Sequence, residues 1–255
     1  MPVHNDQVER LPFGLLASRQ WLLDQDMSLH AFDNALKSGK FVSLARGVVA
    51  RPGVPVTWQG LAASLDRMMP EPVYVGGLSA LELAGLGHYL RLLQRIHLYS
   101  AAPRPAWLQK LDLGVEVVWH STRRLWSEEA LESANSLKPQ PGSGDWSYRV
   151  AAPEQACLEV LADVPDRVSF EHADQLMQGL TALSPRRLDS LLQGCRHVRV
   201  KRLFFFFAER WGHDWLLRLD AADYDLGSGK RVVAKEGRLD RKYQITVPEA
   251  LLGPG

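Results

Sequence analysis

The stretch Ser28-Leu-His-Ala-Phe-Asp-Asn-Ala-Leu-Lys-Ser-Gly-Lys-Phe-Val-Ser-Leu-Ala-Arg-Gly-Val-Val-Ala50 decides the fold of the amino-terminal part of the chain. Its first serine is placed to cap a helix over Leu29 to Lys37, and Gly39 is placed to end that helix. Just upstream, Ser18 is placed to cap a shorter helix over Arg19 to Gln25. The two capped segments predict a pair of helices joined by a tight turn.

The second half of the same stretch has the pattern of a β-hairpin. Phe41 to Leu44 and Val48 to Ala50 are short apolar runs, and Ala45-Arg46-Gly47 separates them. Gly47 suits the positive φ that such a turn requires. A helix, a turn, a second helix and a hairpin follow one another in the order of a winged helix-turn-helix.

The second helix has two chemically different faces. Leu29, Phe32 and Leu36 are spaced for one apolar face, which we expect to be buried. The opposite face offers polar side chains that could read bases in a major groove, and the hairpin tip could reach the DNA backbone or minor groove. The alternative is a small helix pair with an ordinary solvated face. The candidate DNA-binding residues are Ser28, His30, Asn34, Lys37, Lys40 and Arg46.

Beyond the hairpin, helix and strand signals alternate, so we expect an α+β protein. We expect a winged helix-turn-helix domain over residues 1–94 and a mixed α/β domain over 95–255. An exposed loop is expected over Asn135 to Asp145, which contains two prolines and two glycines, and a β-rich tail over Trp215 to Val247. The expected helices cover Trp58–Met69, Leu78–Ala84, Pro153–Ala162, Ser169–Leu180, a segment starting at Pro185, and Val198–Glu209. The last of these segments could equally form a buried strand. The expected strands cover Val73–Val75, Ile96–Tyr99 and Val115–Trp119.

A second group of basic residues lies between Ser184 and Glu209. It could bind a phosphate backbone, meet an acidic partner, or simply be a solvated face. The four phenylalanines that follow it, Phe204 to Phe207, are expected in the core, because exposed they would form a large sticky patch. The basic residues are Arg186, Arg187, Arg196, Arg199, Lys201 and Arg202.

Composition limits the function classes. The chain has 255 residues and a net charge of +1, so any nucleic-acid site must be a local patch. Two distant cysteines and a polar amino terminus without a signal-peptide core favour a reducing cytoplasm, with no membrane partner. The histidines show no metal-ligand spacing, and we expect neither a metal nor a cofactor.

Catalytic motifs have weak support. The run Leu226 to Arg231 resembles a phosphate-binding loop, but Tyr224 and Arg231 occupy the positions where that motif needs a glycine and a Ser or Thr. A metal-dependent nuclease remains an alternative, with its site drawn from the acidic residues and lysine of the tail. Those residues are Asp223, Asp225, Lys235 and Glu236.

Four blocks in order carry a likeness to a known family. They are Leu36-Lys-Ser-Gly-Lys-Phe-Val-Ser-Leu-Ala-Arg-Gly-Val48, Leu78-Ser-Ala-Leu-Glu-Leu-Ala-Gly-Leu86, Ala152-Pro-Glu-Gln-Ala156, and the runs between Ser184 and Pro248. Together they resemble AbiEi-type antitoxins of bacterial type IV toxin–antitoxin systems over nearly the whole chain. In this chain the wing ends Gly47-Val-Val49, where relatives often have an aromatic residue.

The resemblance implies a regulator and not an enzyme. Such proteins repress their own two-gene operon by binding inverted repeats in promoter DNA, which calls for two copies on the duplex. They counteract a nucleotidyltransferase-like toxin without holding it in a stable complex; direct masking of the toxin is the alternative. The matched positions are Ser28, His30, Asn34 and Lys37 in the recognition helix, Lys40 and Arg46 in the wing, and Arg186, Arg187, Arg199, Lys201 and Arg202 in a carboxy-terminal antitoxin domain.

Overall fold

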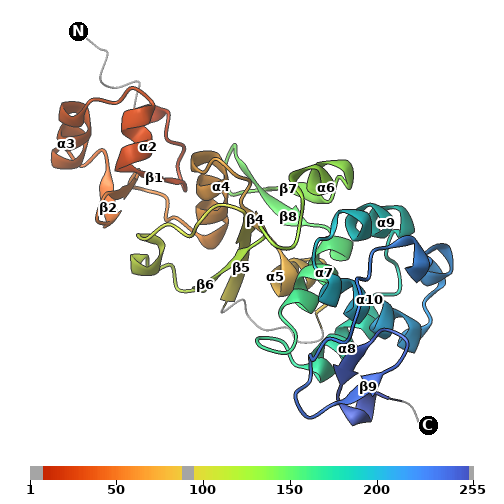
Figure 1. Cartoon of the computed structure of the whole chain (residues 1–255). Coiled ribbons are helices and arrows are strands. Elements are labelled where there is room, and N and C mark those ends of the chain that lie inside the picture. Colours follow the sequence, from red (N-terminus) through yellow and green to blue (C-terminus); the bar gives the residue numbers. More distant parts are fainter. Residues whose placement is uncertain (1–7, 88–94, 253–255) are drawn as a thin grey trace. The chain divides into compact units, whose positions relative to one another are not determined.

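The computed structural model describes residues 8–87 and 95–252 (Figure 1). The described residues form two compact units that interleave along the chain. The first takes its residues from Met1–Val75, Leu92–Ser121 and Pro139–Val150, and the second from Gly76–Arg91, Thr122–Lys138 and Ala151–Gly255. The expected domain boundary after residue 94 falls on the interval 88–94, outside the described residues, and stays a prediction.

The first unit begins with the predicted winged helix-turn-helix. Helix α2 (Arg19–Asp24) and helix α3 (Leu29–Lys37) are each capped by the serine before them, whose hydroxyl accepts a hydrogen bond from a backbone nitrogen of the first turn. Strands β2 (Val42–Ala45) and β3 (Val48–Ala50) form the hairpin, and Gly47 has a φ of 74° in its turn. The helix pair and the hairpin are therefore confirmed.

A third strand completes the small sheet of the wing. Strand β1 (Leu16–Ser18) pairs antiparallel with β3, so that the sheet has the order β1-β3-β2. Strand β1 was not predicted, because three residues are too few to establish an alternating pattern. Pairing with a buried partner strand, and not intrinsic propensity, explains its conformation.

A five-stranded sheet follows, preceded by helix α4 (Trp58–Met68). Its order is β6 (Glu116–Ser121), β5 (Arg95–Ser100), β4 (Tyr74–Val75), β8 (Ser147–Ala151) and β7 (Leu137–Pro141), with β5 parallel to β6 and β4 parallel to β8. The expected loop over Asn135 to Asp145 was therefore wrong in its first half. Strand β7 lies at the edge of the sheet, where a proline removes no required ladder hydrogen bond.

The second unit is mainly helical. Its helices are α5 (Gly77–Leu83), α6 (Glu128–Ser133), α7 (Pro153–Ala162), α8 (Phe170–Gly179), α9 (Pro185–Gly194) and α10 (Val198–Trp211). The tail was expected to be β-rich, which is wrong. It holds two short 3₁₀ helices (Asp214–Arg218, which begins one residue earlier, and Ala221–Asp223) and one pair of short strands, β9 (Arg238–Asp240) and β10 (Ile245–Val247). A further 3₁₀ helix, Glu249–Leu251, follows the tail.

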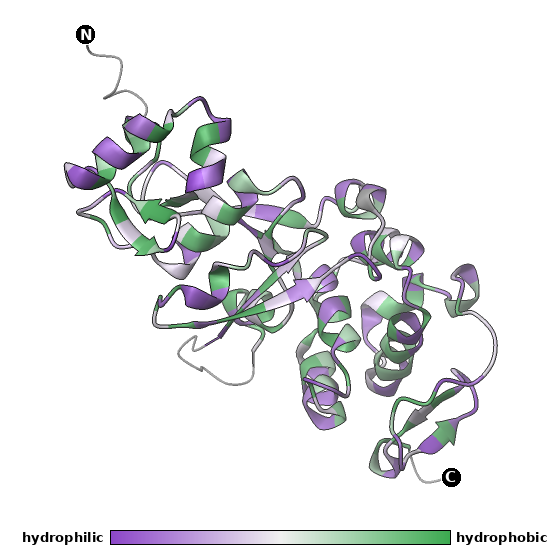
Figure 2. Ribbon diagram, turned by 60° about the vertical axis from the view of Figure 1, so that its left-hand side comes forward, coloured by the Kyte–Doolittle hydropathy of each residue, from purple (hydrophilic) through white to green (hydrophobic). Residues whose placement is uncertain are grey.

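Helices α7 and α10 form the core of the second unit. Phe204, Phe205, Phe206 and Phe207 are all buried on α10, so the prediction of a core position is confirmed and the segment is a helix. Figure 2 shows helices of both units carrying hydrophilic and hydrophobic stretches, as expected when one face packs inward. Among the described residues, no helix is long and apolar enough to cross a membrane.

Candidate nucleic-acid interface

Helix α3 presents the predicted polar face to solvent. His30, Asn34 and Lys37 are exposed, and Asn34 Nδ2 lies 2.9 Å from His30 Nε2. Ser28 is also exposed, but its hydroxyl accepts a hydrogen bond from Ala31 N at 3.1 Å. Ser28 therefore fixes the start of the helix, and the other three side chains are the ones available to a ligand.

The buried face of α3 is rotated from the predicted one. Leu29 is 51% exposed, whereas Ala31, Phe32 and Ala35 are buried. Phe32 packs against Phe41, with ring centroids 6.2 Å apart. Two alanines on the inner face let the helix lie close to its neighbours, which spacing of large residues alone could not reveal.

A hollow of about 420 Å³ opens beside α3. Three of the predicted DNA-binding residues, Asn34, Lys37 and Lys40, contribute to its wall. Its floor includes the alanines of the buried face and Val8. The hollow thus brings one amide and two ammonium groups together at the end of the helix.

The hairpin tip is held close to the helix pair. Gly47 O accepts a hydrogen bond from Arg19 N at 2.7 Å, which ties the turn of the wing to the first residue of α2. Arg46 is exposed beside this anchor. All six predicted DNA-binding residues are therefore exposed, on α3, on the turn after it and on the wing.

Helix α4 positions the wing through contacts with strand β1. Ser64 Oγ accepts a hydrogen bond from Leu16 N at 2.9 Å and donates one to Gly60 O at 2.6 Å. Position 60 must be glycine, because a Cβ there would lie 2.0 Å from the carbonyl oxygen of Gly14. Strand β1 is thus fixed against α4 by close backbone approach.

A distant segment of the chain also supports the winged helix. Trp146, in the turn before β8, donates from its indole nitrogen to Phe13 O at 3.0 Å. Arg51 lies over the Phe13 ring, 3.8 Å from its centroid. Arg149 of β8 forms a bidentate pair with Asp66 of α4. Nothing in the spacing of the sequence signalled these contacts, since their partners lie far apart in the chain.

The second predicted basic group does not form a continuous surface. Arg186 is exposed, but Lys201 and Arg202 are only 4% and 3% exposed. Arg187 forms an ion pair with Glu154 at 2.9 Å, and Arg199 donates from Nη2 to Ala162 O at 2.9 Å. All residues of α10 from Val200 to Ala208 are buried, Lys201 and Arg202 among them, so a charge count along the sequence overestimated the surface.

Arg202 has several hydrogen-bond partners that the sequence did not predict. Its guanidinium donates to the carbonyl oxygens of Leu226, Gly227 and Gly229 at 2.6–3.0 Å and to Gln244 O at 3.2 Å. Burial, and then the charge of Arg231, lower the pKa of Arg202 from its ordinary value. The side chain thus organises the glycine-containing turn that resembled a phosphate-binding loop.

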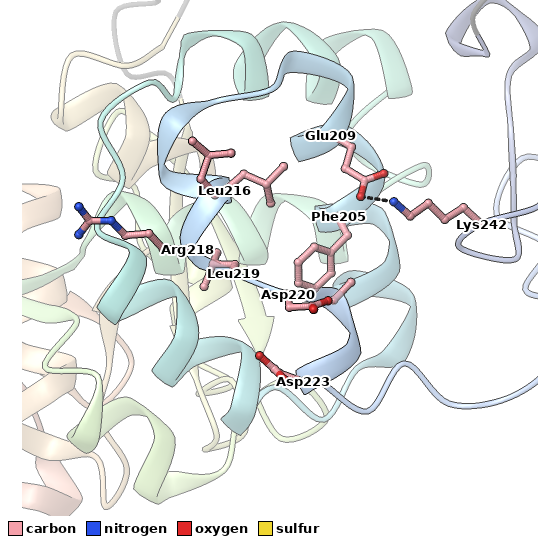
Figure 3. A pocket seen from close by; sticks show the side chains of 10 residues that line it. Phe205, Glu209, Leu216, Arg218, Leu219, Asp220, Asp223 and Lys242 are labelled. Carbon is pink, nitrogen blue, oxygen red and sulfur yellow. Dashed lines mark hydrogen bonds and ion pairs between the residues drawn. The ribbon is translucent and has the colours of Figure 1, made fainter.

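A pocket of about 510 Å³ opens beside α10 in the second unit (Figure 3). Phe205, Leu216 and Leu219 provide its apolar part, and Asp220 and Asp223 lie on one side of it (Figure 3). On another side, Glu209 accepts hydrogen bonds from Lys242 Nζ at 2.5 Å and from Tyr243 Oη at 2.6 Å. The lining residues include no histidine, cysteine or serine, so the pocket holds no Ser–His or Cys–His pair.

The residues of the nuclease alternative do not gather into a site. In the described part of the chain, Asp223, Asp225 and Glu236 do not form a metal-ligand group, and Asp225 accepts a hydrogen bond from Gly227 N. The two cysteines, Cys157 and Cys195, are buried, which raises the pKa of the Cys195 thiol to about 11. Neither cysteine has the character of a nucleophile.

The structure also brings two histidines together in the first unit. His97 on β5 and His120 on β6 lie with Nδ1 and Nε2 2.9 Å apart and with their rings stacked. Tyr99 stacks on the other side of His120, with centroids 4.3 Å apart. The parallel register of the two strands creates this contact, and the scattered positions in the sequence did not predict it.

Two family models together match nearly the whole chain. Residues 3–92 match the model described as the N-terminal domain of the AbiEi antitoxin, a transcriptional regulator. Residues 93–248 match the model described as a transcriptional regulator, AbiEi antitoxin, of a type IV toxin–antitoxin system. No curated protein matches the chain.

Proposed function

Since this chain belongs to the family of AbiEi antitoxins, the transcriptional regulators of type IV toxin–antitoxin systems, we propose that it represses its own operon. In this proposal the chain binds inverted repeats in its promoter through α3 and the β2–β3 hairpin. It also counteracts a nucleotidyltransferase-like toxin encoded by the neighbouring gene. Its mode of action is binding and not catalysis.

The observation that carries the DNA-binding proposal is the exposed polar face of α3 beside the anchored wing. Asn34, Lys37 and Lys40 line one hollow, and Arg46 is exposed at the hairpin tip. The amide of Asn34 can form hydrogen bonds with both the acceptor and the donor on the edge of an adenine, and the Lys and Arg side chains can bind phosphates. The hydrogen bond between Arg19 N and Gly47 O attaches the wing to α2 and supports a fixed distance between the base contact of α3 and the backbone contact of the wing.

Charge supports the same assignment. From Met27 to Gly60 the chain has four Lys and Arg residues against one Asp, although the whole chain is nearly neutral. A local positive surface is what a duplex backbone requires. Inverted repeats present the same half-site twice, so we expect two copies of the chain related by a two-fold axis on the operator.

The test is a gel shift with the purified full chain and the DNA just upstream of its gene, at near-physiological salt and against a scrambled duplex. We expect a specific complex that weakens steeply as salt rises. Equal binding to both duplexes would contradict the proposed repression. A promoter–reporter fusion that is repressed by the chain in cells, and released by changes to α3, provides the functional counterpart.

The antitoxin part of the proposal needs a separate test. Expression of the neighbouring gene should arrest growth, and co-expression of this chain should restore it. In the proposed mode the two proteins do not co-purify, because the chain counteracts the effect of the toxin without holding it. A stable complex would instead favour direct masking of the toxin.

A further inference from the structure

One face of the β5–β6 strand pair carries two imidazole rings side by side. The strands run parallel, with His97 opposite Val118 and Tyr99 opposite His120. Because alternate side chains of a strand point to the same face of the sheet, His97, Tyr99 and His120 share one face. The two histidines are therefore diagonal neighbours across the strand pair, although 23 residues separate them in the chain.

The facing edges of the two rings each carry a nitrogen. His97 Nδ1 and His120 Nε2 are 2.9 Å apart, whereas the ring centroids are 5.1 Å apart and the ring planes differ by 22°. Both nitrogens therefore lie between the rings. A single atom held at this point would contact both of them.

Metal coordination requires nearly the same geometry. Zinc binds imidazole nitrogens at about 2.0–2.1 Å in a tetrahedral arrangement, so two such nitrogens on one ion lie about 3.3 Å apart. The pair has to open by only a few tenths of an ångström from the observed 2.9 Å, which small rotations within the side-chain rotamers provide. Imidazole nitrogen suits zinc, copper and nickel, whereas magnesium and calcium prefer oxygen ligands.

Aromatic neighbours fix the orientation of the His120 ring. Tyr99 stacks on it with centroids 4.3 Å apart and ring planes within 6°, and Tyr74 of β4 stacks on Tyr99 at 5.8 Å. His120 and Tyr99 are only 6% and 3% exposed. One of the two nitrogens is therefore held in place before any ion binds, which lowers the entropy cost of binding.

The other end of the same face opens to solvent. Arg95 and Glu116, which begin β5 and β6, pair with each other in the strand register and form an exposed ion pair at 2.6 Å. Their charges offset one another. His97 lies between this exposed pair and the buried Tyr99, and it is itself half-buried. An ion can therefore reach the two nitrogens from the His97 side.

We propose that His97 and His120 are ligands of a transition-metal dication, for which Zn²⁺ is the probe. The ion links β5 to β6, and its remaining positions take oxygen atoms from water or carboxylates. The sequence predicted no metal because the histidines lack ligand spacing along the chain, whereas strand register brings these two together. The inference goes beyond the proposed repressor function and does not depend on it.

The experiment uses the full chain without a polyhistidine tag, after removal of metal with a chelator and of the chelator by dialysis. Isothermal titration with Zn²⁺ alone should show one ion bound per chain. Mg²⁺ should show no binding, because it requires oxygen ligands. The imidazole NMR signals of His97 and His120 should shift when one equivalent of Zn²⁺ is added.

Two variants and one control locate the ion. His97→Gln and His120→Gln each remove a ligand and should weaken zinc binding by more than about tenfold, the loss that follows even the removal of a partner of a metal ligand. His172→Gln removes a half-buried histidine of the second unit and should leave the affinity unchanged. Urea denaturation of each variant checks that it folds, and the half-buried position of His97 makes its variant the less disruptive of the two.

Three outcomes would overturn the proposal. The first is a wild-type chain that binds no Zn²⁺. The second is zinc affinity that is equal in the wild type and in a folded His97→Gln variant. The third is zinc binding that leaves the imidazole signals of His97 and His120 in place. A gel shift on the operator in the presence of chelator tests the repressor proposal separately, since that proposal requires no metal.

Discussion

Glu159 Oε2 on α7 accepts a hydrogen bond from the backbone nitrogen of Gly77, the first residue of α5, at 2.8 Å. The other carboxylate oxygen accepts from Gln155 Nε2 at 2.8 Å, and Gln155 Oε1 accepts from Ser136 Oγ at 2.5 Å. Glu159 is fully buried, and Gly76 supplies no side-chain cap to α5. A carboxylate from a neighbouring helix thus caps α5 across a long sequence distance.

Glu159→Ala should lower the free energy of unfolding by about 2 kcal/mol or more, because it leaves buried donors on Gly77 and Gln155 without acceptors. Urea denaturation of the full chain measures the change. Glu159→Gln keeps one side-chain oxygen and should cost less than the alanine variant. Equal stability of both variants and the wild type would refute the capping role of the carboxylate.

Arg46→Ala tests the wing. The side chain is exposed at a turn that is fixed to α2, so its loss should weaken binding similarly on all duplexes and lower the slope of log affinity against log salt by about 0.9. Titrations at several salt concentrations give the slope. Arg218→Ala, which removes an exposed arginine of the other unit, is the control. An unaltered slope for Arg46→Ala would exclude a phosphate contact by the wing.

Asn34→Ala tests base reading by α3. Removal of a bidentate contact with an adenine should reduce the preference for operator over scrambled duplex by about 1–3 kcal/mol, while non-specific binding stays near its original strength. Competition titrations measure the ratio of the two affinities. A uniform loss on both duplexes would instead assign Asn34 to backbone positioning.

Arg202→Leu tests the guanidinium that holds the turn over Leu226 to Gly229. Because several carbonyl oxygens lose a charged donor, we expect the free energy of unfolding to fall by about 3 kcal/mol. Backbone amides of the turn should also exchange hydrogen faster. Arg202→Lys retains the charge but cannot reach four carbonyls at once, so it should show most of the loss. Wild-type exchange rates in the turn would contradict this role.

His197 should make the fold sensitive to mild acid. Its folded-state pKa lies below the ordinary value of about 6.5, with burial as the largest cause. The unfolded chain therefore binds more protons as pH falls below about 6.5, and stability decreases in that direction. His197→Gln removes this titration, so the difference in Tm between pH 7.5 and pH 5.5 should become smaller. A difference of equal size in both proteins would show that other groups cause the acid sensitivity.

Local chemistry made much of the fold predictable. Ser18 and Ser28 were expected to cap helices, and further helices were expected to start at Trp58, Ser169 and Pro185. In the structure Ser18, Ser28, Thr57, Ser169 and Ser184 each cap a helix and accept a hydrogen bond from a backbone nitrogen three residues later. The capping residue and its partner are so close in the chain that no tertiary contact is needed to recognise them. Gly47 was also predictable from its immediate neighbours, because the turn between the two strands requires a positive φ.

Features that depend on distant partners were not predictable. Strand β7 contains two prolines and has the composition of a loop, yet its position at the sheet edge tolerates them. Lys201 and Arg202 were counted as surface charges because the sequence does not show that α10 is buried on all sides from Val200 to Ala208.

The contact between Trp146 and Phe13 has a consequence for the order in which the chain is made. Helix α3 emerges from the ribosome early. Trp146 and Arg149, which contact Phe13 and Asp66 of the same unit, emerge only after the segment that follows residue 121 has been synthesised. A chain that stops before this point has every predicted base-reading residue but lacks Trp146, whose indole nitrogen donates to Phe13 O. Interrupted synthesis would thus yield a fragment with an incomplete first unit, because the last segment of that unit ends at Val150.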